Sequence, residues 1–425
     1  MNNFSNNTSW EKILDKYDII EKINENGQFI ITANQIKEFR EPRLMVKFDA
    51  REAMPLCFIR NELSILPITR GSYIIGKFKL YKDFPEQKND TKPTPFSIPS
   101  YLETVNVEDI HSEAGAINIA LISQLFDDFL EEYNMTQTVS GRMGSGKFNF
   151  LVHNGTDAHP VFVQNSQIEI DAGVENENIF TIVEAKNVIN SNFLIRQLYY
   201  PYRVWKNKIS KPIHTIFMVY SNGVFRLLEY KFEQENLYNS LVLTKEKYYS
   251  AENTDISLED IIETFKSTEI KQSPANIPFI QADSFEKLIS LVENIKNNPL
   301  TTEEIAELFS FDERQSDYYY NAAAYLGLME KRREDNIVRV YLTQLGENVL
   351  KLRYKERQLK LIKLILSNRI FNEIFSISIK QGDIPDREYI KKRMRELKVC
   401  NEPQIHRRSS SVISWIKWIL SRQTY

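Results

Sequence analysis

The stretch from Gln167 to Lys186, QIEIDAGVENENIFTIVEAK, decides the fold that we expect for this chain. It predicts two strands joined by a polar turn, the first ending at Asp171 and the second carrying Glu184, Ala185 and Lys186. Because side chains alternate along a strand, Glu184 and Lys186 project from one face, and the neighbouring strand can bring Asp171 beside them. Such charges are costly to bury unless a ligand balances them. Two carboxylates suit Mg²⁺ with waters and a substrate phosphate.

The spacing D-x12-E-x-K across two strands resembles the signature of the PD-(D/E)xK nucleases, with Ile170 where that family often has proline. An E-x-K tripeptide is also common as an ion pair on an exposed strand, so the neighbouring segments have to support the resemblance. The elements expected around the two motif strands are a helix over 113–133, a strand over 147–152, a helix over 192–206, and strands over 213–221 and 223–232.

This order resembles the αβββαβ core of the family and implies an α/β restriction-endonuclease-like core with a mixed sheet. Because segments typical of winged helices follow the core, the whole chain resembles a multidomain type II restriction endonuclease. The expected domains are an α+β N-terminal domain with possible DNA contact (1–104), the catalytic core (105–232), a helical connector (233–298), a winged helix-turn-helix (299–346) and a basic helical DNA-binding domain (347–425).

The resemblance also implies a metal-dependent phosphodiesterase chemistry. Asp171 and Glu184 would hold Mg²⁺ against the scissile phosphate, with the backbone carbonyl of Ala185 as a further ligand. Lys186 would orient the attacking water and lower its pKa, while the metal stabilises the developing negative charge.

Enzymes of this family often carry a further carboxylate on the helix before the motif. Glu113 stands at the start of that expected helix and is our candidate, with Glu131 and Glu132 as alternatives. A helix dipole also favours an acid at this position, which is the structural explanation for Glu113. Gln197, one turn after Phe193 on the helix that follows the motif, is the remaining candidate catalytic residue.

The helix after the motif carries two arginines in positions suited to DNA. Arg196 and Arg203 are seven residues apart, so we expect both on one helical face, where they would grip the phosphates that flank the cut. Pro201 should kink this helix or shorten its start. Tyr199 and Trp205 are expected in the core.

The stretch VSGRMGSGKFNF, residues 139–150, contains the spacing G-x-x-x-x-G-K. A phosphate-binding P-loop requires Ser or Thr after the lysine and a helix behind it. Here Phe148 follows Lys147 and the sequence continues as a predicted strand, which argues against ATP binding. We expect a loop whose Arg142 and Lys147 contact the DNA backbone.

Composition bounds the chain to a few domains in a reducing compartment. A length of 425 residues allows two to four domains with real cores. Cys57 and Cys400 are the two cysteines, far apart in sequence, so they predict neither disulfides nor zinc and favour the cytoplasm. The N-terminus lacks a signal-peptide pattern, and no apolar run approaches the roughly 18 residues of a membrane span. We expect no membrane partner.

Charge is unevenly distributed. The net charge is −3, yet residues 330–425 hold 22 Lys and Arg against 11 Asp and Glu, which is +11 and leaves −14 elsewhere. A basic region on an acidic body indicates a local nucleic-acid footprint, and the alternative is a solvated helical surface. The N-terminal domain also interleaves cations that could meet phosphates, and scaffolding is the equal alternative: Arg40, Arg43, Lys47, Arg51, Arg60, Arg70, Lys77 and Lys79.

Two C-terminal segments predict DNA contacts. Helix, helix and hairpin over 299–346 read as a winged helix-turn-helix, in which Arg332 and Arg333 of the wing would meet phosphates. Such units also serve as dimerisation modules. The last helix pairs an apolar stripe with a polar face and a basic start, which suits the major groove. Its expected contacts are Arg407, Arg408, Ser410, Ser414 and Lys417.

These patterns together predict a Mg²⁺-dependent, sequence-specific endonuclease that cuts double-stranded DNA. The resemblance implies a homodimer on DNA, because a duplex cut needs two active sites, and a cognate DNA methyltransferase that protects the host. A structure-specific or repair nuclease with the same core is the alternative enzyme. A non-catalytic winged-helix regulator, with the charged residues as a structural ion cluster, is the alternative from another class.

Overall fold

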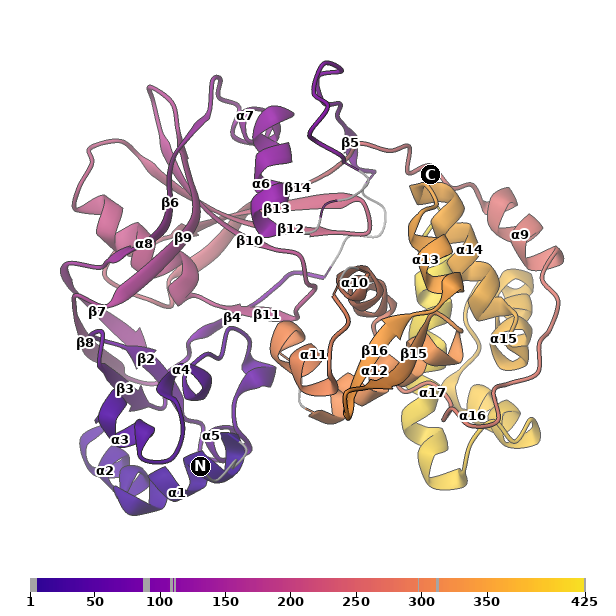
Figure 1. Cartoon of the computed structure of the whole chain (residues 1–425), viewed down its shortest axis with the longest axis horizontal. Coiled ribbons are helices and arrows are strands. Elements are labelled where there is room, and N and C mark those ends of the chain that lie inside the picture. Colours follow the sequence, from indigo (N-terminus) through magenta and orange to yellow (C-terminus); the bar gives the residue numbers. More distant parts are fainter. Residues whose placement is uncertain are drawn as a thin grey trace.

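The computed structural model shows a mixed α/β protein (Figure 1). An N-terminal α+β body lies beside a seven-stranded mixed sheet, and the C-terminal part of the chain forms a mainly helical body. In the part of the chain that the structure describes, no helix is long and apolar enough to cross a membrane. The described residues are 6–86, 92–107, 110, 112–296, 298–310 and 313–423.

The central sheet has the strand order β5-β14-β13-β12-β10-β9-β6. Its neighbours are antiparallel except β10–β12 and β5–β14, which are parallel. The strands are β5 (Thr94–Pro95), β6 (Thr136–Gly144), β9 (Gln167–Glu175), β10 (Phe180–Lys186), β12 (Ile213–Ser221), β13 (Val224–Phe232) and β14 (Leu241–Ser250).

Helices cover both faces of this sheet. Because parallel strands need a crossover, α8 (Arg196–Lys206) joins β10 to β12 and packs against both. The opposite face is covered by α6 (Glu113–Ile122) and α7 (Leu125–Leu130). Ala185 is buried in that second layer, so Glu184 projects from the other face, as the alternation along the strand predicts.

The N-terminal body joins the core through short strand pairs. Its sheet has the order β1-β3-β2, and β4 pairs with β11 just before α8. A separate hairpin, β7–β8, packs between this body and α8. The elements are α1 (Asn6–Lys16), α2 (Ile19–Asn26), β1 (Gln28–Thr32), α3 (Ala33–Lys37), α4 (Pro42–Met45), η1 (Arg51–Ala53), α5 (Leu56–Arg60), β2 (Ser64–Pro67), β3 (Ser72–Gly76), β4 (Tyr81–Asp83), β7 (Lys147–His153), β8 (Ala158–Gln164) and β11 (Asn192–Leu194).

The C-terminal body is built around one long buried helix, α17. Trp415 of α17 is fully buried and stacks on Phe371 of α15 at 5.4 Å between ring centroids. A capping box begins α11: the Thr301 side chain accepts a hydrogen bond from the Glu304 N–H, and the Glu304 side chain accepts one from the Thr301 N–H. The elements are α9 (Leu258–Lys266), α10 (Phe285–Ile295), α11 (Thr302–Phe309), α12 (Glu313–Tyr325), β15 (Met329–Glu334), β16 (Ile337–Leu342), α13 (Gln344–Leu350), α14 (Tyr354–Leu366), α15 (Arg369–Gln381), α16 (Arg387–Glu396) and α17 (Glu402–Leu420).

Three expected elements before the motif differ from the observed ones. The helix expected over 113–133 is interrupted, because Gln124 adopts a left-handed backbone (φ 56°) between α6 and α7. The glycine-rich stretch expected as a loop instead supplies the end of β6, which pairs with β9 through irregular register at Val139 and Gly141. The strand beginning at Lys147 lies outside the central sheet, so the prediction that it belongs to the core was wrong.

Two further segments also differ from expectation. Residues 192–194 form β11, so the helix expected from residue 192 begins at Arg196. The stretch 233–298 was expected to be helical, but residues 241–250 form β14 and extend the central sheet. β11 pairs with β4, which lies far away in the sequence, so the local pattern gives no warning of that pairing. β14 instead pairs with β13, the strand that directly precedes it.

The turn between β12 and β13 docks the sheet onto the C-terminal body. Asn222 and Gly223 have φ values of 55° and 74°, as a tight Asn-Gly hairpin requires. The buried amide of Asn222 exchanges hydrogen bonds with Gln358 of α14, at 2.8 and 3.2 Å. Glu293 of α10 accepts from Ser221 Oγ at 2.8 Å and from the Asn222 backbone N–H at 3.0 Å.

We predict that Asn222→Ala destabilises the protein by more than its backbone conformation alone explains. The change leaves the buried Gln358 amide without its partner, which costs about 1–3 kcal/mol. Asn336→Ala is the matched control, because Asn336 is exposed and also has a positive φ (63°). Urea unfolding of both variants should show the larger loss for Asn222. Equal losses would contradict the importance of the buried amide pair.

Candidate active site

The charged residues of the motif converge at the end of β10. The pairing of β9 with β10 ends at Val183 and Ala172, so beyond this point the two strands no longer bond to each other along their backbones. Asp171 fills that position: its Oδ2 accepts a hydrogen bond from the Ala185 backbone N–H at 2.8 Å. The Asp171 carboxylate is therefore fixed beside the last residues of β10, as the sequence predicts.

Lys186 is the centre of the cluster. Its Nζ lies 2.8 Å from Glu184 Oε1 and 3.4 Å from Glu113 Oε1, and it donates to the Ala185 carbonyl at 3.0 Å. Gln197 of α8 donates from Nε2 to the same Glu184 oxygen. Four elements, β9, β10, α6 and α8, thus contribute side chains to one small volume.

Glu113 is the helix acid that the fold brings to this cluster. Its two sequence alternatives lie elsewhere: Glu131 forms an ion pair with Lys245, and Glu132 accepts hydrogen bonds from Asn176 and Asn178. The start of α6 faces the end of β10, whereas Glu131 and Glu132 follow α7 at the other end of the layer. Glu113 is therefore the one of the three that contacts Lys186 in the structure.

The cluster carries an excess of negative charge. With all groups ionised, three carboxylates (Asp171, Glu184 and Glu113) and the single ammonium of Lys186 sum to −2. Burial raises the pKa of Glu184 to about 8, although Lys186 opposes this shift. Burial alone would lower the pKa of Lys186, but the neighbouring carboxylates outweigh it and raise that pKa. Burial also raises the pKa of Glu113. A bound proton or cation is favoured here.

The donor atoms fit a magnesium ion. Within the described residues, no group of three or more His, Cys, Asp or Glu side chains is arranged as a metal site. Mg²⁺ commonly uses only one or two carboxylates and completes its shell with waters and substrate oxygens. Asp171 and Glu184 supply two carboxylates, and Gln197 Oε1 is a buried oxygen without a hydrogen-bond partner. These hard oxygen donors are the type that Mg²⁺ selects.

The cluster lies in a cleft of about 970 Å³ between the core and the N-terminal body. Arg142, Arg196 and Gln197 line the core side of this cleft. Arg196 is half-buried, with its guanidinium 5.8 Å from the Tyr200 ring centroid. Arg142 is exposed and forms an ion pair with Glu169 at 3.3 Å. Two of the predicted DNA-binding arginines, Arg142 and Arg196, therefore border the same cleft as the carboxylates.

Two other predicted contacts lie away from this cleft. Lys147 is exposed at the start of β7 but does not line the cleft. Arg203 is only 5% exposed; it donates to Tyr199 Oη and to the Glu235 carbonyl, both at 3.1 Å. Its place in the core contradicts the predicted phosphate contact, because α8 turns that part of its face toward buried aromatic rings such as Phe148.

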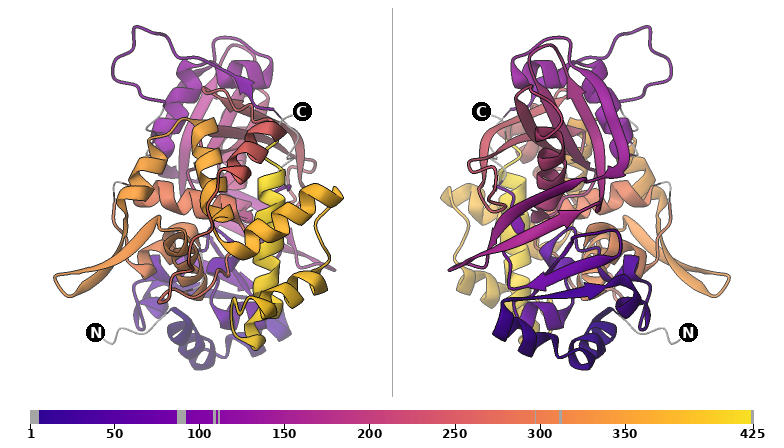
Figure 2. Two further views of the ribbon diagram at one scale, coloured as in Figure 1. Left: turned by 90° about the vertical axis from the view of Figure 1, so that its right-hand side faces the viewer. Right: turned by 90° about the vertical axis from the view of Figure 1, so that its left-hand side faces the viewer.

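The predicted wing is an exposed hairpin. β15 and β16 pair antiparallel around Asp335 and Asn336, and Figure 2 shows the hairpin projecting from the C-terminal body. Arg333 is exposed, and Arg332 is exposed but bonded to Glu330 of the same strand. Tyr319 of α12 is buried in the core of the C-terminal body.

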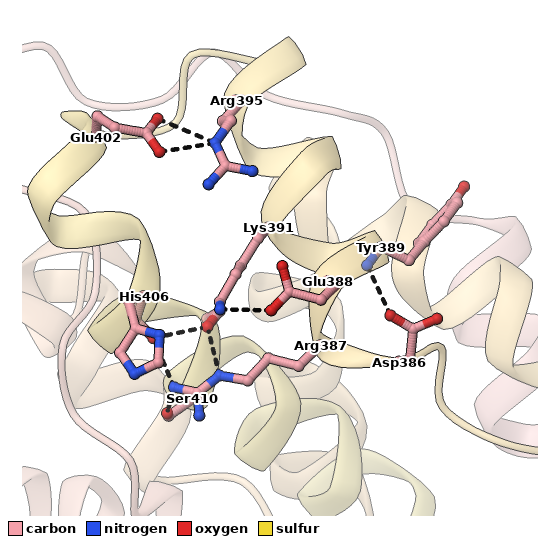
Figure 3. Close-up of polar contacts among 10 residues, drawn as sticks. Asp386, Arg387, Glu388, Tyr389, Lys391, Arg395, Glu402, His406 and Ser410 are labelled. Carbon is pink, nitrogen blue, oxygen red and sulfur yellow. Dashed lines mark hydrogen bonds and ion pairs between the residues drawn. The ribbon is translucent and has the colours of Figure 1, made fainter.

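The last helix was predicted to enter the major groove, and its packing opposes this. Figure 3 shows Arg387 of α16 bonded to the start of α17: it donates to Ser410 Oγ at 2.7 Å and to the His406 carbonyl at 2.6 Å. Arg408 is buried and Ser414 is half-buried, because the helix lies between α10, α15 and α16. Of the five predicted contacts, the exposed ones are Arg407, whose guanidinium lies over the Tyr318 ring, and Lys417.

Two residues that line the cleft were not predicted from the sequence. Lys37 and Glu307 line the cleft, although neither was singled out. A solitary exposed Lys or Glu gives no local signal, so only the approach of distant segments identifies it. Glu307 comes from α11 of the C-terminal body, which shows that three parts of the chain border this cleft.

Comparisons with known proteins give three family matches without a described activity. Residues 7–75 match a domain of unknown function (DUF6996), residues 76–250 match another (DUF6997), and residues 287–424 match a third (DUF7226). No curated protein and no solved structure matches the chain. Every residue of the carboxylate–lysine cluster falls within the match over residues 76–250.

We predict that Glu184→Gln stabilises the metal-free protein increasingly as the pH rises. The folded pKa of Glu184, about 8, lies above its ordinary value of 4.5. The native state therefore loses stability as pH rises between these values, by up to about 1.4 kcal/mol per pH unit, and glutamine removes this loss. Urea unfolding in a chelator, from about pH 5 to about pH 9, measures the difference.

Glu175→Gln provides a control of opposite sign. A hydrogen bond from Lys211 lowers the pKa of Glu175, so its stabilising contribution is present above its ordinary pKa and is lost as the pH falls. That variant should be less stable than the parent by an amount that hardly changes between about pH 6 and about pH 9. A pH-independent effect of Glu184→Gln would show that its carboxylate is not held at a raised pKa.

Proposed function

We propose that this protein is a Mg²⁺-dependent endonuclease that cleaves double-stranded DNA at specific sequences, as a type II restriction enzyme of the PD-(D/E)xK group does. The observation that carries the proposal is the convergence of Asp171, Glu184 and Lys186 at the end of β10, inside a cleft bordered by exposed cations. An excess of buried negative charge on oxygen donors, beside cations that face solvent, suits a metal ion and a polyanion together.

The order of the core elements supports the same reading. With α7, β11 and the β7–β8 hairpin left out, α6, β6, β9, β10, α8 and β12 follow the αβββαβ order that the family resemblance implies, with β6 in place of the strand expected over 147–152. β9 and β10 are antiparallel, α8 crosses between the parallel strands β10 and β12, and the motif residues stand where β9 and β10 separate. This arrangement supports the restriction-endonuclease-like fold as part of the proposal.

Asp171 and Glu184 would hold the metal, with the Ala185 carbonyl and Gln197 Oε1 as nearby oxygen donors. When bound, Mg²⁺ would supply a positive charge that stabilises the phosphate's developing charge and lowers the pKa of water. Gln197 fixes the Glu184 carboxylate by donating a hydrogen bond to it. The Ala185 N–H does the same for Asp171. The chain thus preorganises both carboxylates.

Lys186 would act as a hydrogen-bond donor rather than as a base. Its neighbouring carboxylates raise its pKa, so it remains protonated at neutral pH. The ammonium would orient the attacking water and offset negative charge on the phosphate. As the water oxygen bonds to phosphorus and the P–O3′ bond breaks, the attacking water loses a proton, and the departing 3′-oxygen takes up a proton from solvent water. Glu113, 3.4 Å from Lys186 and with a pKa raised by burial, is the suited acceptor.

The proposal carries the partners that the family resemblance implies. A cut through both strands requires two copies of the site, so we propose a homodimer on DNA. Cleavage would leave a 5′-phosphate, and a cognate methyltransferase would protect the host's own sites. The proposed location is the cytoplasm, where host DNA and methyltransferase would meet the enzyme.

We predict that the purified protein cuts unmethylated phage DNA into discrete bands when Mg²⁺ is present. Asp171→Ala should abolish cutting, because it removes a metal ligand. Lys186→Ala should slow cutting by at least about 10²-fold, as expected when a donor to developing charge is lost. The rate of band appearance on gels measures both effects. Glu131→Gln is the control, since Glu131 is exposed and paired with Lys245 far from the cluster.

Other outcomes separate the alternatives. A smear of products that follows DNA shape would replace the sequence-specific reading by a repair or structure-specific nuclease. Intact DNA with the parent and all variants, across several metals and DNA sources, would leave a non-catalytic DNA-binding protein. Loss of cutting in Glu131→Gln as well would show that the assay reports folding rather than the site.

A further inference from the structure

Four cations of the N-terminal body face the candidate active site across the cleft. Lys37 ends α3, Arg43 belongs to α4, Lys47 follows α4, and Arg70 stands in the turn between β2 and β3. All four are exposed and line the same cleft as Asp171 and Lys186. We call these four residues the cationic wall. They come from separate segments, so the fold rather than a local sequence run gathers them.

The cationic wall lacks internal neutralisation. Within the described part of the chain, no ion pair involves any of its four members, whereas Lys16 and Arg51 of the same body pair with Glu38 and Asp83. The carboxylates of Glu41 and Asp49 also line this side of the cleft, which leaves a net of +2 from four cations and two acids. Neighbouring cations without anionic partners repel one another, and an extended anion would relieve that repulsion.

The backbone segment that follows Lys47 is hydrogen-bonded to β11, the strand that leads into α8. β11 pairs with β4, and its Leu194 N–H donates to the Asp49 carbonyl at 3.0 Å. Asn192 of β11 accepts from the Arg51 N–H and donates to Glu52, both at 2.8 Å. β11 leads directly into α8, which carries Gln197 of the cluster. The same short strand therefore connects the segment that follows Lys47 with the helix whose Gln197 holds Glu184.

We infer that the cationic wall binds the phosphate backbone of the DNA duplex whose scissile phosphate lies at Lys186. This inference rests on the proposed function and identifies the N-terminal body as a substrate-binding part of the same site. The contacts are made to phosphates by flexible, exposed side chains, so they supply affinity and register but no reading of base sequence. The N-terminal body then holds the duplex against the core from the opposite side of the cleft.

The test is DNA binding by the full chain, measured without cleavage. Arg43→Ala, Lys47→Ala and Arg70→Ala are combined in one triple variant, and the anisotropy of a short fluorescent duplex of mixed sequence is recorded in a chelator over a range of salt. Each lost phosphate contact lowers the slope of log affinity against log salt by about 0.9, so the slope should fall by about 2.7. At low salt the affinity should fall at least about tenfold.

The matched control is Arg60→Ala with Lys77→Ala. Both residues are exposed cations of the same body, but they line a different hollow beside α2. This double variant should keep the parent's affinity and salt slope. A triple variant that binds as tightly and with the same salt slope as the parent would overturn the inference. A parent that binds no duplex would overturn it as well.

Failure of the inference is distinguishable from failure of the proposed function. Lys186→Ala is measured in the same binding assay, and cutting by the parent is measured separately. If the parent cuts DNA and the triple variant binds normally, the inference alone fails. If the parent binds DNA through the cationic wall but never cuts it, the inference holds and the proposed cleavage fails. Equal thermal melting of parent and triple variant establishes that the exposed substitutions leave the fold intact.

Discussion

The contact between Lys186 and the buried Glu184 is the constraint on which the rest of this structure depends. A single ammonium among three carboxylates leaves net negative charge around a buried group, and burial of charge is costly. The fold accepts this cost by anchoring each group: backbone donation to Asp171, amide donation from Gln197, and the start of α6 for Glu113. Arrangements that cost stability in this way are typical of functional sites.

The strands and helices around this contact bring its residues together. The parallel pair β10–β12 requires the crossover helix α8, and that helix brings Gln197 to the motif strands. The strand before α8 also binds the N-terminal body, so one continuous segment connects the cleft's two sides. The tip of the β12–β13 hairpin, through Asn222, ties the other end of the sheet to the C-terminal body. The N-terminal and C-terminal bodies are thus both attached to the central sheet.

The C-terminal body shows that an excess of basic residues does not define a binding surface. Much of that charge is used inside the protein: Arg387 ties α16 to α17, and Arg393 bonds to Glu373 of α15 at 2.6 Å. The long helix α17 is a core element around Trp415. In contrast, the four cations of the cationic wall are exposed and lie in the N-terminal body, outside the basic C-terminal region.

The sequence by itself determined what depends on neighbouring residues. It predicted two adjacent motif strands, the shared face of Glu184 and Lys186, and the convergence of Asp171 with the end of the next strand. Tertiary structure decided the rest: the choice of Glu113 among three acids, the burial of Arg203, and the cleft shared by two bodies. Burial and ion pairing depend on which distant segments meet, and that packing is absent from any local pattern.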